Sequence, residues 1–448
     1  MKDKLLSAWE AIHSSFWFVP TVMGIGAILA AFASVHLDRT IGSEFANSAG
    51  FIWSGGADGA RSLLSTIAGS MITVAGTVFS ITIVALTLAS SQFGPRLLRN
   101  FVRDTGVQIT LGTFTATFLY CIFVLRTVRA VDEGAFIPSI AITVAIALAI
   151  ASLGVLIYFI HHVSASIQAE NLIAKVGAEL CASVDKHFPA REAGNTGTQS
   201  GEQEFQAQVA LSGGLLVRSS RSGYVQAIRQ DSLVEFAQKH DLRMELNCAP
   251  GDFILSRAVL LTMWSQHDQA PPKSDVRELC RYFNLGSQRT EEQDVRYGAR
   301  ELAEIAARAL SPGINDPYTA MGCVDWICDM LARVAERGLA PEFISDAAGI
   351  VRIKQRPPDF AALCITAIEP IISYGLNSAQ VAQHTVTALT RVADNIVRSE
   401  DARALHAELG RIATQAGVQL KDQEILQRIT ASIAHTQQRL SMFANHVH

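Results

Sequence analysis

The chain has 448 residues, of which 49% are hydrophobic and 17% are charged, with a formal net charge of −4 at pH 7. This balance, without a strongly basic domain, argues against nucleic acid as a partner. Seven cysteines occur without a CxxC pair or a close cysteine–histidine pairing, which favours reduced thiols over disulfides and argues against structural zinc. We expect no metal and no other cofactor.

Four apolar segments are each long enough to cross a bilayer as a helix. They cover about residues 16–35, 63–90, 107–125 and 139–160. Two lysines precede the first segment, as in a signal peptide, but no small-residue cleavage site follows it. The sequence therefore predicts a four-helix transmembrane domain over residues 1–165, beginning with an uncleaved span.

An even number of spans places both termini on one side of the membrane. Lysine and arginine near the spans favour the cytoplasmic side for one set of loops, although the bias is modest. The expected cytoplasmic set is Lys2, Lys4, Arg96, Arg99, Arg103 and Lys175, and the expected outer set is Arg39, Arg61, Arg126 and Arg129. We expect both termini in the cytoplasm.

The second apolar segment carries no charged side chain between Arg61 and Arg96. On a helix, its small and hydroxyl residues share one face, within about 60° of the direction of Ser62. This small-residue stripe comprises Ser65, Gly69, Thr73, Gly76, Ser80 and Thr87. It predicts either close packing between helices or the lining of a hydrated path in an oligomer. In both interpretations the stripe meets protein or water rather than lipid.

The loop after this segment begins with Gly94-Pro95, which ends the helix. Arg96, Arg99 and Arg103 then recur at helical spacing, typical of a short amphipathic helix at the inner membrane surface. These arginines could bind lipid phosphate, or form a positive ring at the inner mouth of a path.

After the fourth span, residues 166–206 are predicted to form a cytosolic helical extension and a polar linker at 192–206. His161 and His162 precede it; we expect interfacial histidines, with a pH-responsive pair as the alternative. Residues 207–286 are predicted to form a small β-barrel or sandwich. Its strands are expected at 215–217, 224–228, 243–247 and 253–255, with a helix at 232–240.

Residues 287–448 are predicted to form a helical bundle, so the soluble part has an α+β fold. Its later helices are expected at 318–337, 345–354, 358–374, 378–399, 402–417 and 421–443. The turn before the first of these suits a helix stop followed by Asp316 as N-cap and Pro317 as the first helical residue. The alternative is a ligand or subunit-contact loop made by Ser311, Pro312, Gly313, Asn315 and Asp316.

Five sequence segments of this chain together carry a resemblance to a known family. They are HSSFWFVP at 13–20, the charge-poor segment 61–101, LGTFTATFLYCIFVLRTVR at 111–129, IYFIHH at 157–162 and RALSPGINDPYTA at 308–320. In these the chain resembles the bacterial membrane-protein family called domain of unknown function 2254, from His13 to at least Trp326. The resemblance implies a four-span inner-membrane protein with a large soluble part. It implies no activity and no catalytic residue.

No GxSxG, HExxH, Walker A or nucleophile–base set is present in the sequence, so we expect no enzyme and no catalytic residue. Two hypotheses remain. The first is a homo-oligomeric channel-like or transport-related protein with the second span at the axis, small ions as ligands and a cytosolic regulatory domain. The alternative is a membrane-anchored sensor or scaffold that conducts nothing.

Overall fold

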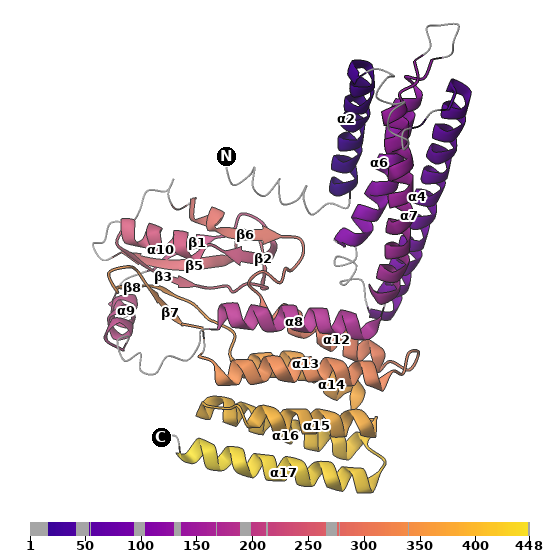
Figure 1. Ribbon diagram of the computed structural model, residues 1–448. Helices are drawn as coiled ribbons and strands as arrows, with labels where there is room; N and C mark the ends of the chain where they lie inside the picture. The colour runs from indigo at the N-terminus through magenta and orange to yellow at the C-terminus, as the bar shows by residue number, and fades with distance from the viewer. Residues whose placement is uncertain are drawn as a thin grey trace. The chain divides into compact units, whose positions relative to one another are not determined.

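The computed structural model describes residues 17–41, 53, 55–93, 104–129, 136–166, 168–188, 199–211, 214–265, 276, 278–338 and 340–446. The chain divides into two compact units, Met1–Asn171 and Leu172–His448. The first is helical and the second combines helices with two sheets (Figure 1).

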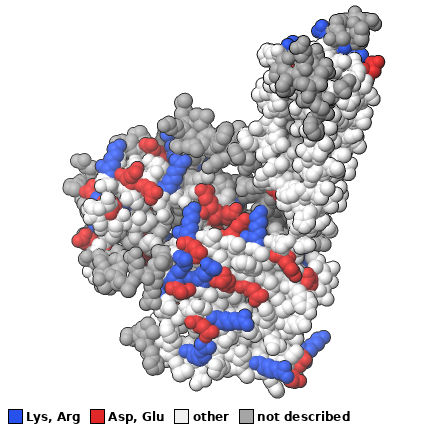
Figure 2. Space-filling view, in the orientation of Figure 1, with Lys and Arg blue, Asp and Glu red and all other residues white. Residues whose placement is uncertain are grey.

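The first unit contains four helices long and apolar enough to cross a membrane. They are α2 (Phe18–Ile41), α4 (Ala57–Phe93), α6 (Thr105–Leu125) and α7 (Ser139–Ser166). The four predicted spans are therefore confirmed as helices. The side chains drawn along them are mostly uncharged in Figure 2, as a surface in contact with lipid requires.

Helix α6 is the centre of this unit, because it packs against α2, α4 and α7 and is the most buried of the four. At one end of the bundle, both carboxylate oxygens of Asp38 accept hydrogen bonds, each of 2.9 Å, from the backbone N–H groups of Ile140 and Ala141. The Tyr120 hydroxyl donates to the Ala141 carbonyl at 3.1 Å. These contacts satisfy backbone donors at the start of α7 and fix α2 and α6 against it.

The second unit contains two sheets. The larger has the strand order β1 (Leu215–Arg218), β5 (Val259–Ser265), β3 (Leu242–Leu246), β8 (Val351–Lys354) and β7 (Phe343–Ser345), parallel only between β3 and β8. The smaller has the order β4 (Phe253–Ile254), β2 (Gly223–Ile228) and β6 (Phe283–Gly286). A β-rich domain was expected and two sheets are present. Their closure into a barrel or sandwich stays a prediction.

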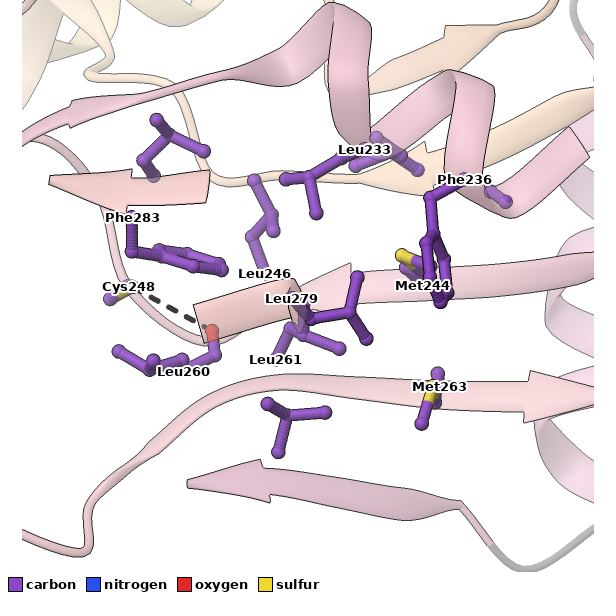
Figure 3. Close-up of a cluster of buried hydrophobic side chains, with 14 of the residues drawn as sticks. Leu233, Phe236, Met244, Leu246, Cys248, Leu260, Leu261, Met263, Leu279 and Phe283 are labelled. Atoms are coloured by element: carbon purple, nitrogen blue, oxygen red, sulfur yellow. Dashed lines mark hydrogen bonds between the residues drawn. The ribbon is translucent and has the colours of Figure 1, made fainter. Parts of the chain in front are cut away.

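One hydrophobic core joins the sheets to helix α10 (Gln230–Lys239). Phe236 of α10 points towards Met244 of β3, and Leu233 and Phe283 belong to the same cluster (Figure 3). The Cys248 thiol is buried here and donates to the Leu260 carbonyl at 3.6 Å. The helix predicted at 232–240 is therefore confirmed, and its apolar face covers this core.

The helix predicted at 345–354 is wrong, because strand β7 ends at Ser345 and strand β8 occupies Val351–Lys354. Arg352 is 5% exposed and bonds Asp346 at 2.8 Å and Asp241 at 2.7 Å. Asp346 also accepts from the N–H groups of Ala348 and Ile350 and so closes the turn between the strands. Strand pairing with β3, distant in sequence, overrides the local helical tendency.

The polar linker predicted at 192–206 is also partly wrong, since helix α9 (Gln199–Leu211) occupies its second half. Phe205 is buried in this helix, with its ring centroid 5.8 Å from that of Phe343 and 6.4 Å from that of Trp264. Packing of this one aromatic side chain against two strands that are distant in the chain therefore orders a segment that is polar on average.

Most of the remaining helices pack on one another: α12 on α13 and α14, α13 on α15, α14 on α16, α15 on α17, and α16 on α17. Their bounds are α8 (Ala169–His187), α12 (Val295–Ala309), α13 (Pro317–Glu336), α14 (Phe360–Gly375), α15 (Ala379–Ala393), α16 (Ser399–Gln419) and α17 (Gln423–His446). Asp316 caps α13 by accepting from the N–H groups of Tyr318 and Thr319, each at 3.1 Å, and Pro317 begins the helix as predicted. Whether these helices form a separate bundle domain stays a prediction.

Candidate functional site

Helix α4 has two different faces. One is buried against the rest of its unit and is rich in alanine: Ala60, Leu64, Ala68, Ala75, Val78, Ala85 and Ala89. Every residue of the small-residue stripe is exposed instead: Ser65, Gly69, Thr73, Gly76, Ser80 and Thr87. On a helical wheel the two sets lie about 180° apart. The stripe therefore does not serve packing among the four spans of its own chain.

The hydroxyl groups of the stripe are satisfied within α4. Thr73 donates to the Gly69 carbonyl at 2.8 Å, and Ser80 donates to the Gly76 carbonyl at 2.9 Å. Thr87 donates in the same way to Ile83, also at 2.9 Å. A face that meets its own hydrogen-bonding needs can sit against another helix without water.

The two glycines of the stripe are open. A Cβ atom added at Gly69 or at Gly76 would meet no heavy atom within 4 Å. Neither glycine is thus required for close contact within one chain, and each leaves a shallow notch on the exposed face. The arginines predicted to lie at the inner mouth, Arg96, Arg99 and Arg103, fall in the segment 94–103, outside the described residues.

In the second unit, a cavity of about 370 Å³ lies between α8 and α12. Its apolar walls come from Val176 and Leu180 of α8 and Val295 of α12. Charged and polar side chains also line it: Glu179, Ser183, Lys186, His187, Glu291, Glu292, Asp294 and Glu301. None of these was singled out as a binding group from the sequence, because they come from separate segments.

The carboxylates of this cavity differ in their surroundings. The Asp294 side chain is almost fully buried and pairs with Arg289 at 2.7 Å and with Arg296 at 3.5 Å. Burial, and next the charge of Glu291, raise the pKa of Glu179 above its ordinary value. The excess of carboxylates suits a compact cation rather than an anion. Among the described residues, no group of three histidine, cysteine or acidic side chains is arranged to hold a metal ion.

The loop predicted as a ligand or subunit contact follows α12 and is held by its own backbone. Asn315 has a φ of 51° and its N–H group donates to the Ser311 carbonyl at 2.9 Å, while the Asp316 N–H group donates to Ala309 at 2.8 Å. Pro312 and Gly313 are exposed. The cavity lies at the first half of α12 and the loop beyond its last residue, so the structure does not bring the two together.

The carboxyl side of the loop is apolar and exposed. Ile314 is 41% exposed, and Tyr318, in the first turn of α13, is 70% exposed. The connection between two helices is fully explained by the Asp316 cap. A contact role for Ser311, Pro312, Gly313, Asn315 and Asp316 stays a prediction.

Comparison with known proteins supports a membrane protein. The chain is 31% identical over 435 residues to the "Uncharacterized protein MT1328" of Mycobacterium tuberculosis, an alignment that covers 94% of this chain and 80% of the relative. It has the same identity and coverage with the "Uncharacterized protein Mb1321c" of Mycobacterium bovis. No solved structure matches the chain. The model of the family described as "Predicted membrane protein (DUF2254)" matches residues 13–391, and the chain therefore belongs to this family of predicted membrane proteins.

Proposed function

We propose that this protein is a homo-oligomer of the bacterial inner membrane in which the small-residue stripe of α4 faces the symmetry axis. The observation that supports this most is the difference between the two faces of α4: the alanine face packs on its own chain, while none of the described residues covers the stripe. Small side chains allow close approach of helices from neighbouring subunits. The proposed arrangement has both termini in the cytoplasm, consistent with the flanking charges.

In this proposal the axis is a path for small ions, and the soluble unit regulates it. A lining of glycine and hydroxyl groups needs no ionisable side chain at depth, unlike most ion-coupled carriers. Arg96, Arg99 and Arg103 would place positive charge at the inner mouth and favour anions. The carboxylate-lined cavity between α8 and α12 would be the ligand-responsive part. We propose no enzymatic step.

The alternative is a membrane-anchored sensor or scaffold without conduction. The observation that favours it is the internal hydrogen bonding of Thr73, Ser80 and Thr87, which leaves these hydroxyl groups with no need of water. In that case the stripes of neighbouring subunits would close on one another as a dry contact.

Single cysteines along α4 separate the two functions. In the channel, cysteines at Thr73, Gly76 and Ser80 react with a small charged thiol reagent, and reactivity falls at the flanking positions Val74 and Ile81. The double variant Arg96→Glu, Arg99→Glu then shifts the current of reconstituted protein from anions towards cations, less so at high salt. An oligomer whose stripe cysteines stay unreactive and that conducts nothing supports the anchor and rejects the path.

A further inference from the structure

Asp104 and His162 form a polar contact between α6 and α7 that the proposed function does not use. Nε2 of His162 lies 2.8 Å from each carboxylate oxygen of Asp104, although 58 residues separate them in the chain. Asp104 is also the N-cap of α6, accepting from the Gly106 N–H group at 2.8 Å and the Val107 N–H group at 3.4 Å. The contact thus joins the first turn of α6 to a position one turn before the end of α7.

The backbone is shaped to admit the imidazole. A Cβ atom at Gly106 would lie 2.7 Å from Nε2 of His162 and 2.9 Å from the hydroxyl oxygen of Tyr158, too close for any real side chain. The imidazole stacks on the Tyr158 ring, with centroids 5.3 Å apart and an interplanar angle of 16°. Nδ1 faces the Tyr158 hydroxyl at 3.5 Å. The ring is therefore held on both sides in an orientation that presents Nε2 to the carboxylate.

The pair is half-enclosed, with 27% of the His162 side chain and 18% of the Asp104 side chain exposed. A small cavity beside Asp104 is lined by Thr82, Ala85 and Leu86 of α4 and by Val163 of α7. Helix α4 therefore presents no titratable group there, and on α7 the titratable neighbours of His162 are Tyr158 and His161. Arg103, next to Asp104 in the chain, lies outside the described residues.

We propose that Asp104 and His162 are a proton-sensitive latch that holds the end of α7 against the start of α6. With a neutral imidazole, the contact is one N–H donated to a carboxylate, and the pair carries a net negative charge. When His162 takes up a proton at Nδ1, the contact becomes an imidazolium–carboxylate ion pair without net charge. Protonation adds the attraction between two opposite charges to a hydrogen bond that the ionised carboxylate already strengthens, and an ion pair without net charge is less costly to enclose than a lone carboxylate.

The latch therefore tightens when the imidazole is protonated. Both partners belong to one chain, so the latch does not depend on assembly through α4 and either proposal can fail alone. It gives the protein a response to pH at the end of α7, from which the chain continues into α8 after Ser166 and two further residues.

Hydrogen–deuterium exchange of full-length protein in lipid nanodiscs tests the latch. The peptide that carries the last turns of α7 should be better protected at about pH 5.5 than at about pH 8, after correction for the intrinsic exchange rate. His162→Gln keeps a neutral donor but cannot be protonated, so its protection should not change with pH. His161→Gln is the matched control and should retain the full response.

Two further variants guard against a change in folding. Asp104→Asn keeps a capping oxygen for α6 but should lose the pH response, and Gly106→Ala should lose it by displacing the imidazole. A wild-type peptide whose protection is the same at both pH values overturns the latch. A response that survives in His162→Gln, or that disappears in His161→Gln, overturns it as well.

Discussion

Gly177 of α8 lies directly against the indole of Trp326 on α13, so that a Cβ atom at position 177 would fall 2.2 Å from the ring. The two helices run in parallel register, with Cys181 donating to Asp329 at 3.1 Å and Arg333 bonding Asp185 at 3.2 Å further along. This close contact fixes α8 onto the helical layer of the second unit. The side of α8 towards α12 is left to line the cavity.

Substituting Gly177 tests this packing. Gly177→Ala should lower the stability of the second unit by about 1–3 kcal/mol, because the indole must move to make room. Gly417→Ala on α16 is the control, since an added Cβ there meets no atom within 4 Å and a helix prefers alanine. Thermal unfolding of the two variants should move in opposite directions. Equal transition temperatures for Gly177→Ala and wild type would contradict the contact.

Arg352 holds the unexpected strand pair in place. Burial alone would raise the pKa of Asp346, but the hydrogen bonds from Arg352, Ile350 and Ala348 outweigh it and hold that pKa below its ordinary value. Arg352→Met leaves the buried carboxylate without its cation and should cost about 3–5 kcal/mol at neutral pH. The exposed Arg428→Met, which loses only a surface pair with Glu424, should cost less than about 1 kcal/mol.

The pH dependence follows from the direction of that pKa. A carboxyl group whose pKa is lowered on folding stabilises the protein above its unfolded pKa, and this contribution is lost as pH falls through the folded value. The difference between wild type and Arg352→Met, measured by denaturant unfolding, should therefore shrink below about pH 3.8. A difference that stays constant through that range would contradict the role assigned to Asp346.

The cysteines provide a test of the core. All seven are free and six are buried, while Cys280 is partly exposed. Burial raises the pKa of the Cys181 and Cys248 thiols to about 12, so almost no thiolate is present at neutral pH. Native protein should incorporate one thiol reagent, at Cys280, and denatured protein seven. Rapid native labelling of Cys181 would show that α8 separates from α13.

The sequence predicts features that depend on local pattern. Span length, the Asp316 cap and the helix predicted at 232–240 follow from periodicity and neighbouring residues, and each is present, the helix as α10 at Gln230–Lys239. Features that depend on distant partners could not be predicted. Strand β8 forms by pairing with β3, and α9 is held by the packing of Phe205 on Phe343 of β7. The contact of His162 depends on Asp104, which lies 58 residues away in the chain.

The candidate site likewise has one part that the sequence predicts and another that it does not. Helical periodicity alone places the stripe on one face of α4, but only the packing of the alanine face on α6 and its neighbours reveals that the stripe is uncovered. The cavity between α8 and α12 could not be predicted from the sequence, because its lining comes from two segments about 100 residues apart that carry no motif.

Disulfide trapping along α4 tests most directly whether the stripe is where copies of the chain meet. In a Cys280→Ser background, Gly76→Cys should form a covalent dimer under mild oxidation in native membranes. Gly154→Cys on α7 is the matched control, because it is equally open within the chain but lies off the stripe. The account predicts a cross-linked dimer for Gly76→Cys and none for Gly154→Cys, with a complex larger than one chain by mass in detergent. A monomeric mass together with no cross-link at Gly76 would contradict it.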